Sequence, residues 1–258
     1  MNNQHLNEKK TRLSVDYFEK MHIIKNRKED EVAIMLIQFN FKNFRSFREE
    51  VTLDLSATKM TEFSERVVTI GSEKILPIAA IYGANASGKS NIYSAFEYMA
   101  EYVVDSFKYG DEEEKFEEYR PTPFLFDSTS ADAESSFEVY FTIPGDKNEK
   151  TYNYGFCVDQ EGVTEEWLNS KAKTARKYST VFYRGNSDSE LDLSGLPKNS
   201  RDNIKIALEK QVLIASLGAK LKISKCKAIR DWFLINEFAD FGDPVTNFFL
   251  SHRLPRGF

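Results

Sequence analysis

Gly83-Ala-Asn-Ala-Ser-Gly-Lys-Ser90 is the stretch that decides which fold this chain is expected to adopt. It fits the pattern G-x-x-x-x-G-K-[ST] of the phosphate-binding P-loop. Gly83 and Gly88 allow backbone turns at which a side chain would clash, so that N–H groups point inward and form a nest for an anion. Lys89 would reach the β- and γ-phosphates of a nucleotide, and the Ser90 hydroxyl would ligate Mg²⁺. The motif therefore predicts a site for a nucleotide and Mg²⁺, with Lys89 as its catalytic residue.

The residues on both sides of this loop supply the context that a P-loop requires. Ile75–Tyr82 is a short apolar run, which is typical of a buried central strand. Ser90–Phe107 carries apolar residues at helical spacing, and the positive end of this helix would face the phosphates. The order of strand, glycine loop and helix favours phosphate binding over the alternative, a glycine-rich turn that binds nothing.

The composition is that of a globular chain with one large domain or two small ones. Of 258 residues, 41% are hydrophobic and 29% are charged, and no apolar run approaches the length of a membrane span. The net charge of −5 does not indicate DNA as a partner, although a local basic groove stays compatible with it. Two separated cysteines and three histidines argue against a zinc site. With no signal-peptide pattern, we expect a cytoplasmic protein.

Changes in composition along the chain predict four segments. Residues 1–34 are polar and charged, and we expect a disordered extension, with Met35 as an alternative start. Residues 35–120 hold the P-loop core, and residues 121–200 read as an antiparallel β insertion. Residues 201–258 form a helical segment that looks truncated. The predicted fold class is α/β, with a P-loop lobe, an inserted antiparallel sheet and trailing helices.

Period-2 patterns and turn signals predict the strands, and helical periodicity predicts the later helices. The expected strands begin at Met35 and cover residues 51–55, 137–143, 152–158, 163–168 and 180–183. The expected helices cover residues 201–217 and 225–241. The acidic run at residues 108–120 is expected to be a solvated face or loop rather than a metal cluster.

Two motifs together resemble a known superfamily. Phe41-Lys-Asn-Phe-Arg-Ser-Phe47 is followed about forty residues later by Gly83-Ala-Asn-Ala-Ser-Gly-Lys-Ser-Asn91. This pair resembles the ABC/SMC-like ATPases, the superfamily of RecF, SMC and the OLD nucleases. The nearest resemblance is to bacterial AAA-type ATPases of abortive-infection and other anti-phage systems. It covers about residues 35–240 and implies the N-terminal lobe of an ABC/SMC-like head, with ATP and Mg²⁺ as cofactors.

The motif and the resemblance together imply a set of nucleotide-binding residues. The resemblance places Arg45 and Ser46 near the nucleotide and gives Asn85 a role in shaping the loop. The alternatives are a surface charge on a turn for Arg45 and a plain capping role for Asn91. The full expected set is Arg45, Gly83, Ala84, Asn85, Ala86, Ser87, Gly88, Lys89, Ser90 and Asn91, with Ser90 as the metal ligand.

The elements that ABC-type hydrolysis needs besides a P-loop are not recognisable in the sequence. Trp232-Phe-Leu-Ile-Asn-Glu237 is the nearest match to an apolar strand ending in Asp-Glu, but it has Asn236 at the Asp position. Its apolar residues follow a helical period, so we predict a helix there. Leu193-Ser-Gly-Leu196 is a poor match to a signature loop, and His252 cannot be placed as a switch histidine. The expectation is the N-terminal half of a longer or split ATPase.

Several functions stay open at this point. The first is an ATPase part that needs a homodimer or a complementing C-terminal half, with a nuclease as effector. The second is a non-hydrolysing nucleotide-gated module for a nuclease or a RecF-like repair complex, and the third is a decayed remnant. GTP is disfavoured because no N-K-x-D base-reading motif is present, and a P-loop kinase suits the inserted sheet poorly.

Overall fold

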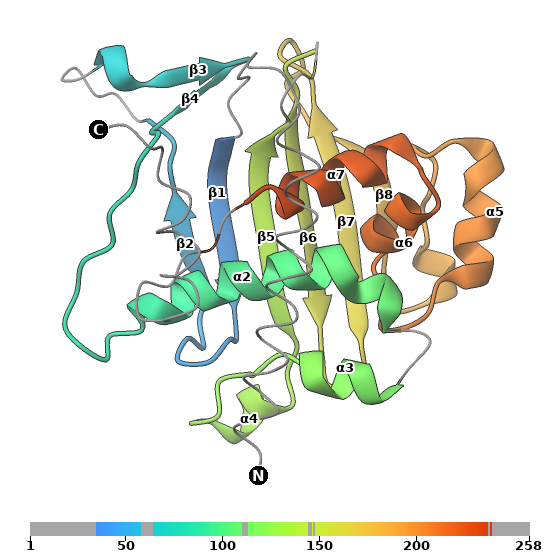
Figure 1. Ribbon diagram of the computed structural model, residues 1–258, viewed down its shortest axis with the longest axis horizontal. Helices are drawn as coiled ribbons and strands as arrows, with labels where there is room; N and C mark the ends of the chain where they lie inside the picture. Colours follow the sequence, from blue (N-terminus) through green and yellow to red (C-terminus); the bar gives the residue numbers. More distant parts are fainter. Residues whose placement is uncertain are drawn as a thin grey trace, which may run out of the picture. The chain divides into compact units, whose positions relative to one another are not determined.

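Six antiparallel strands form the main sheet, in the order β2-β1-β5-β6-β7-β8 (Figure 1). The computed structural model describes residues 35–57, 64–109, 113–143, 146, 148–236 and 238. The strands of this sheet are β1 (Met35–Lys42), β2 (Val51–Asp54), β5 (Ser135–Thr142), β6 (Thr151–Val158), β7 (Val163–Lys171) and β8 (Ser179–Arg184). A second hairpin consists of β3 (Val68–Ile70) and β4 (Glu73–Ile75). The extension expected over residues 1–34 lies outside the described residues.

The helices differ widely in length. The α-helices are α2 (Lys89–Asp105), α3 (Glu113–Tyr119), α4 (Ser128–Ala131), α5 (Lys198–Ala207), α6 (Ile214–Lys220) and α7 (Ser224–Leu234). Short 3₁₀ turns are η1 (Ser64–Arg66), η2 (Ser106–Lys108) and η3 (Asp188–Glu190). Among the helices that the structure describes, none is long and apolar enough to cross a membrane.

The sheet has one apolar and one polar face, which is the reason for the period-2 pattern of its strands. In β1, Phe39 and Phe41 are buried and Lys42 is exposed. Cross-strand register places Phe39 opposite Val139 and Phe41 opposite Phe137, so that their side chains share a face. On the opposite face, hydrogen-bonded polar side chains run from β1 to β7: Gln38, Asn40, Glu138, Asn153 and Asn169.

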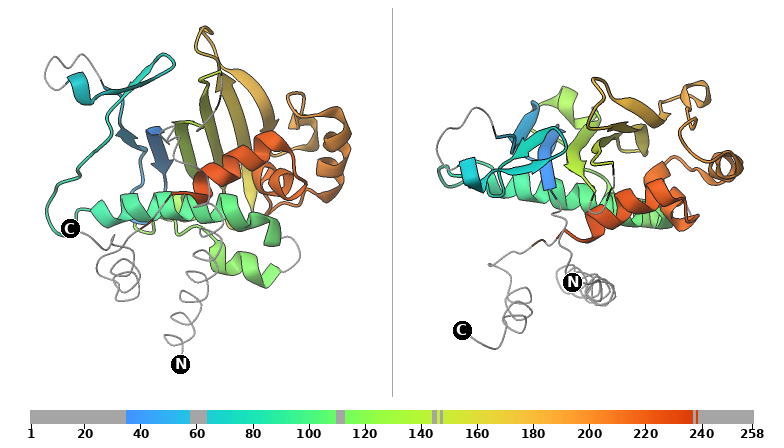
Figure 2. Two further views of the ribbon diagram at one scale, coloured as in Figure 1. Left: turned by 45° about the horizontal axis from the view of Figure 1, so that its top comes forward. Right: turned by 90° about the horizontal axis from the view of Figure 1, so that it is seen from above.

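Helices α2 and α7 cover the apolar face (Figure 2). Tyr102 of α2 stacks on Phe156 of β6, with ring centroids 5.2 Å apart. Trp232 of α7 lies against Phe141 of β5, with ring centroids 4.3 Å apart. All four side chains are buried, and each contributes on the order of 2 kcal/mol through burial of apolar surface. The P-loop helix is therefore anchored on the sheet through its part from Ala95 to Val104.

A buried carboxylate joins the sheet to α6. Glu166 of β7 is fully buried and accepts hydrogen bonds from the backbone N–H groups of Ile214 (2.6 Å) and Ala215 (3.0 Å). It also accepts one from the Tyr154 hydroxyl at 3.0 Å. Burial raises the pKa of Glu166 to about 7, because desolvation outweighs these donors and the nearby Arg184 charge.

Most predicted strands are confirmed, and two predictions about helices need correction. The helix expected over residues 201–217 is two helices, because the carbonyls of Glu209 and Val212 between them accept hydrogen bonds from Arg184, and Glu166 binds the first N–H group of α6. The helix expected over residues 225–241 ends at Leu234. The acidic run contains α3, which buries Phe116 and leaves Glu117 and Glu118 exposed, in agreement with the expected solvated face.

The strand expected over Ile75–Tyr82 is wrong except for its first residue. Ile75 ends β4 and is fully buried, but the chain then leaves the small hairpin without entering the main sheet (Figure 1). Ile78 is 80% exposed and Tyr82 is 89% exposed. An apolar run becomes a buried strand only where neighbouring strands pair with it. In the described part of the chain, β1 to β8 all pair elsewhere.

Candidate nucleotide-binding site

The loop at residues 83–88 has the backbone of a phosphate-binding turn. Ser87 donates its N–H to the Ala84 carbonyl at 3.3 Å, which closes a turn within the loop. Ala86 has φ 62° and Gly88 has φ 88°, so left-handed residues flank Ser87. Alternation of this kind directs successive N–H groups to one side and forms a concave nest for an anion. Residues 83–87 are exposed, so a nucleotide can reach them.

Lys89 holds this loop from within. Its ammonium group donates to the carbonyls of Gly83 at 2.8 Å and Ala84 at 2.6 Å, and it lies 3.4 Å from the Ser87 hydroxyl. The Lys89 ammonium thus lies on the backbone of the loop, where it would compensate the charge of a phosphate bound there. Charge-assisted hydrogen bonds are roughly twice as strong as neutral ones.

The N-terminus of α2 has no side-chain cap. Gly88 occupies the N-cap position and provides no side-chain hydrogen bond, and the first turn has no acidic residue. The first N–H groups of a helix have no partner within it, and the helix dipole is positive there. A helix of 17 residues that begins without a cap is suited to a phosphate group. Ser90 lies in this first turn with its side chain exposed, where its hydroxyl can hold Mg²⁺.

The tip of the β1–β2 hairpin lies against the loop and the first turn of α2. Asn91 donates its side-chain N–H to the Ser46 hydroxyl at 2.7 Å. A Cβ at position 88 would lie 2.9 Å from both the Ser46 Oγ and the Phe47 Cζ, which leaves room only for glycine. The Arg45 guanidinium instead lies over the Phe44 ring, 5.3 Å from its centroid. Ser46 and Phe47 therefore make the close approach to the loop.

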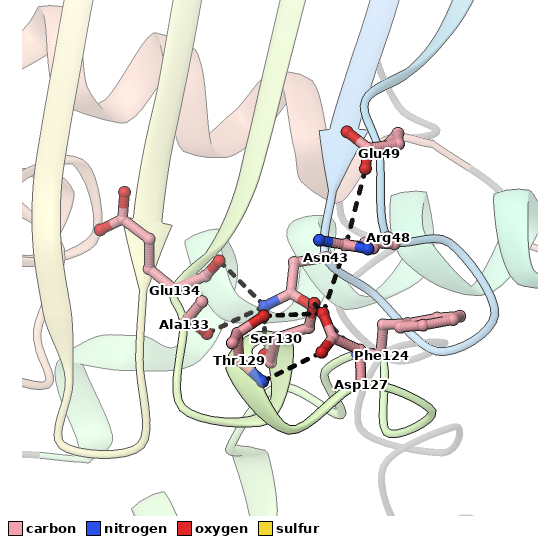
Figure 3. A network of polar contacts seen from close by, with 9 residues as sticks. All are labelled: Asn43, Arg48, Glu49, Phe124, Asp127, Thr129, Ser130, Ala133 and Glu134. Carbon is pink, nitrogen blue, oxygen red and sulfur yellow. Dashed lines mark hydrogen bonds and ion pairs between the residues drawn. The ribbon is translucent and has the colours of Figure 1, made fainter.

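Asn43 fixes the base of this tip (Figure 3). Its side-chain amide donates to the carbonyls of Ser130 (2.9 Å), Ala133 (2.9 Å) and Glu134 (3.2 Å), and its side-chain oxygen accepts from the Phe124 N–H at 3.0 Å. Asn43 is buried and has φ 52°, a conformation that asparagine tolerates better than most residues. The tip is thus tied to the segment that leads into β5.

Comparison with protein-family models identifies a family. A family model described as "AAA domain, putative AbiEii toxin, Type IV TA system" matches residues 78–249, which is more than half of the chain. The chain belongs to this AAA domain family. A comparison with curated proteins found no match. AAA-type domains generally use ATP with Mg²⁺, the cofactor pair that the loop sequence predicts, and the AAA domain supports an ATPase-like, nucleotide-binding function here.

The structure brings most of the predicted site residues together. Residues 83–88 form the loop between the exposed segment and α2, and Lys89, Ser90 and Asn91 form the first turn of α2. Arg45 is on the neighbouring hairpin tip, where its backbone N–H donates to the Thr122 carbonyl at 2.8 Å. The sequence interpretation missed two contributors to this arrangement: the ring of Phe47 and the side-chain network of Asn43. The sequence does contain a signal for both. In Phe41-Lys-Asn-Phe-Arg-Ser-Phe47, aromatic residues recur every three positions at the end of a strand, and Asn43 stands among them.

The nearest sequence match to a metal-binding acidic strand is helical, as predicted. Trp232 and Phe233 lie on α7 and are buried against the sheet. Asn236 follows the end of that helix, and Glu237 lies outside the described residues. Among the described residues, this stretch therefore does not supply a strand that ends in acidic residues beside the P-loop.

Proposed function

We propose that this chain binds Mg-ATP through residues 83–91 and is the nucleotide-binding part of an ABC/SMC-like ATPase. The observation that carries the proposal is the Lys89 ammonium, which donates to the Gly83 and Ala84 carbonyls of the loop, while α2 begins without a side-chain cap. Lys89 compensates phosphate charge, Ser90 holds the metal ion, and the backbone N–H groups of the loop orient the phosphates. Arg45 is a further candidate for phosphate contact, because its side chain is exposed and the adjacent Ser46 contacts Asn91 of the first turn of α2.

Hydrolysis in this proposal needs a second contribution to the site. Phosphoryl transfer depends on a positioned water and on compensation of charge by metal ligands. The exposed apolar segment at residues 76–82, which precedes the P-loop, supports a partner that supplies the missing strands and an acidic residue. A complementing C-terminal ATPase half or a second copy of the chain could be that partner. Alone, the chain should hydrolyse ATP slowly or not at all.

The cellular role that we propose is anti-phage defence in the cytoplasm, with ATP controlling an effector such as a nuclease. The support is the sequence resemblance to abortive-infection ATPases, together with the wording of the family description, which names a toxin of a toxin–antitoxin system. Phage plaque counts on cells that carry the gene with its neighbours, with and without Lys89→Ala, test this role. Unchanged plaque counts would contradict it.

Titration of the purified chain with a fluorescent ATP analogue in the presence of Mg²⁺ tests the nucleotide site. Lys89→Ala should weaken binding by about 100-fold, because a charged hydrogen bond of about 3 kcal/mol is lost. Lys74→Ala is the matched control, since Lys74 is an exposed lysine of β4, and it should leave the affinity unchanged. Ser90→Ala should remove the dependence of the affinity on Mg²⁺. Equal binding by the wild type and Lys89→Ala would sink the proposal.

A further inference from the structure

The tip of the β1–β2 hairpin, residues 43–48, is built as a rigid support. Asn43 and Arg45 both have φ 52°, and Phe44 and Phe47 exchange backbone hydrogen bonds of 2.8 and 3.0 Å. The Phe47 ring packs edge-on against Phe41 of β1, with centroids 5.3 Å apart. Positive φ values in non-glycine residues persist only where the surroundings over-determine them. The four side-chain hydrogen bonds of Asn43 provide that restraint (Figure 3).

This rigid tip contacts the P-loop at two adjacent points. The first is the hydrogen bond from Asn91 to Ser46, which joins residues 45 positions apart. The second is the close approach of Phe47 and Ser46 to Gly88, the N-cap of α2. Both points lie where the loop passes into the helix, whereas residues 83–87 are exposed. The tip therefore controls the position of the helix N-terminus relative to the sheet.

We infer that Ser46 is a positioning residue for nucleotide binding. Its hydroxyl accepts the hydrogen bond from Asn91. The hydrogen bonds of Asn43 fix the hairpin tip that carries Ser46, so they also fix the position of that hydroxyl. The first turn of α2 is thereby held in one orientation before the phosphate arrives. This inference rests on the proposed function, because it assigns a role to Ser46 in the same site.

The expected size of the effect follows from the energy of one hydrogen bond. A site that is ordered before binding loses less conformational freedom when the ligand arrives, so its affinity is higher. A neutral hydrogen bond contributes about 0.5–1.5 kcal/mol, so its loss should weaken nucleotide binding by about 3- to 10-fold. Since Ser46 acts through Asn91, the loss should occur only while Asn91 is present.

A double-mutant cycle in nucleotide binding tests this coupling. The full chain is titrated with a fluorescent ATP analogue and Mg²⁺ as wild type, Ser46→Ala, Asn91→Ala and the double variant. Ser46→Ala should weaken binding by about 3- to 10-fold in the wild-type background and have no effect in the Asn91→Ala background. Ser46→Thr keeps the hydroxyl and should restore most of the affinity. The thermal unfolding midpoint of Ser46→Ala should stay within about 2 °C of the wild type, since both partners are surface groups.

Two results would overturn the inference. One is an equal loss of affinity from Ser46→Ala in both backgrounds, which would make Ser46 independent of Asn91. The other is a lowered unfolding midpoint with unchanged affinity, which would make the hydrogen bond purely structural. Absence of nucleotide binding by the wild type is distinguishable from both, because it overturns the proposed function and this inference with it.

Discussion

The main sheet and the segment that leads into the P-loop contain the same apolar residue types in opposite environments. Ile37 of β1 is 6% exposed, but Ile78 is 80% exposed. Tyr154 of β6 is fully buried, but Tyr82 is 89% exposed. The sheet residues have partner strands and covering helices, whereas residues 76–82 run outside both sheets. An apolar run thus shows which residues would gain from burial, and a partner element decides whether they are buried.

The comparison indicates that the stability of the fold and the proposed nucleotide binding depend on different parts of the chain. The sheet, with α2 and α7 on its apolar face, holds the large buried aromatic side chains (Figure 2). The residues that we propose to bind phosphate lie at the exposed end of α2. Elements with few buried contacts open at low free energy, and ligand-binding segments are commonly of this kind. Substitutions should therefore affect stability in the sheet and nucleotide binding in the loop.

The largest effect should come from a matched pair of tyrosine substitutions. Tyr154→Ala removes a fully buried ring that contacts Phe182 and Phe233, and it should lower the free energy of unfolding by about 3–5 kcal/mol. Tyr82→Ala changes an exposed ring and should alter that free energy by less than about 0.5 kcal/mol. Urea unfolding followed by tryptophan fluorescence measures both. Similar values for the two variants would remove the distinction between the regions.

Glu166→Ala tests the junction between the sheet and α6. The variant leaves the buried N–H groups of Ile214 and Ala215 without their acceptor, so at pH 5 it should lose about 2–4 kcal/mol of unfolding free energy. Glu165→Ala is the matched control on the same strand, because Glu165 is only partly buried and its side chain points to the other face of the sheet. The control should lose less than about 1 kcal/mol. If Glu165→Ala loses as much unfolding free energy as Glu166→Ala, the loss comes from substitution in this part of β7 and not from the hydrogen bonds to α6.

The raised pKa of Glu166 predicts a pH dependence of the same junction. Between its ordinary value of 4.5 and its folded value of about 7, the folded chain keeps a proton that the unfolded chain has released. The folded state then binds more protons, so this group's contribution to stability decreases as the pH rises through that range. The stability advantage of the wild type over Glu166→Gln should fall by about 2–3 kcal/mol from pH 4.5 to pH 7.5. A difference that does not change with pH would contradict the raised pKa.

The strands of the main sheet were predictable from sequence because their pattern is local. The alternation of Ile37, Phe39 and Phe41 with polar residues reflects one covered face, and it predicted β1 correctly. The P-loop was predictable because its residues are consecutive and each has a mechanical reason. The helix at Trp232 was also predictable, since its apolar residues repeat at the helical period.

The parts that could not be predicted depend on contacts between distant residues. Asn43 bonds to carbonyl groups more than 80 positions away, and no local pattern encodes those partners. The break between α5 and α6 depends on Glu166 and Arg184, which belong to strands in the sheet. The exposed course of residues 76–82 depends on which strands are present to pair with them. In each case the deciding information is tertiary, and propensity is overridden.

The smallest effect on stability, and the sharpest test of the comparison, should come from the exposed segment itself. A double substitution of Ile78→Ser and Tyr82→Ser should change the free energy of unfolding by less than about 0.5 kcal/mol, since both side chains are already in water. The same variant should reduce concentration-dependent association of the chain, because an extended apolar segment with exposed backbone groups promotes pairing with other molecules. Light scattering over a concentration series measures this change.

Ile37→Ser is the contrasting variant, because it places a hydroxyl in a buried position and should destabilise the fold. If the double variant unfolds as readily as Ile37→Ser, residues 76–82 are part of the packed structure, and the contrast between the stable sheet and the exposed segment before the P-loop is wrong.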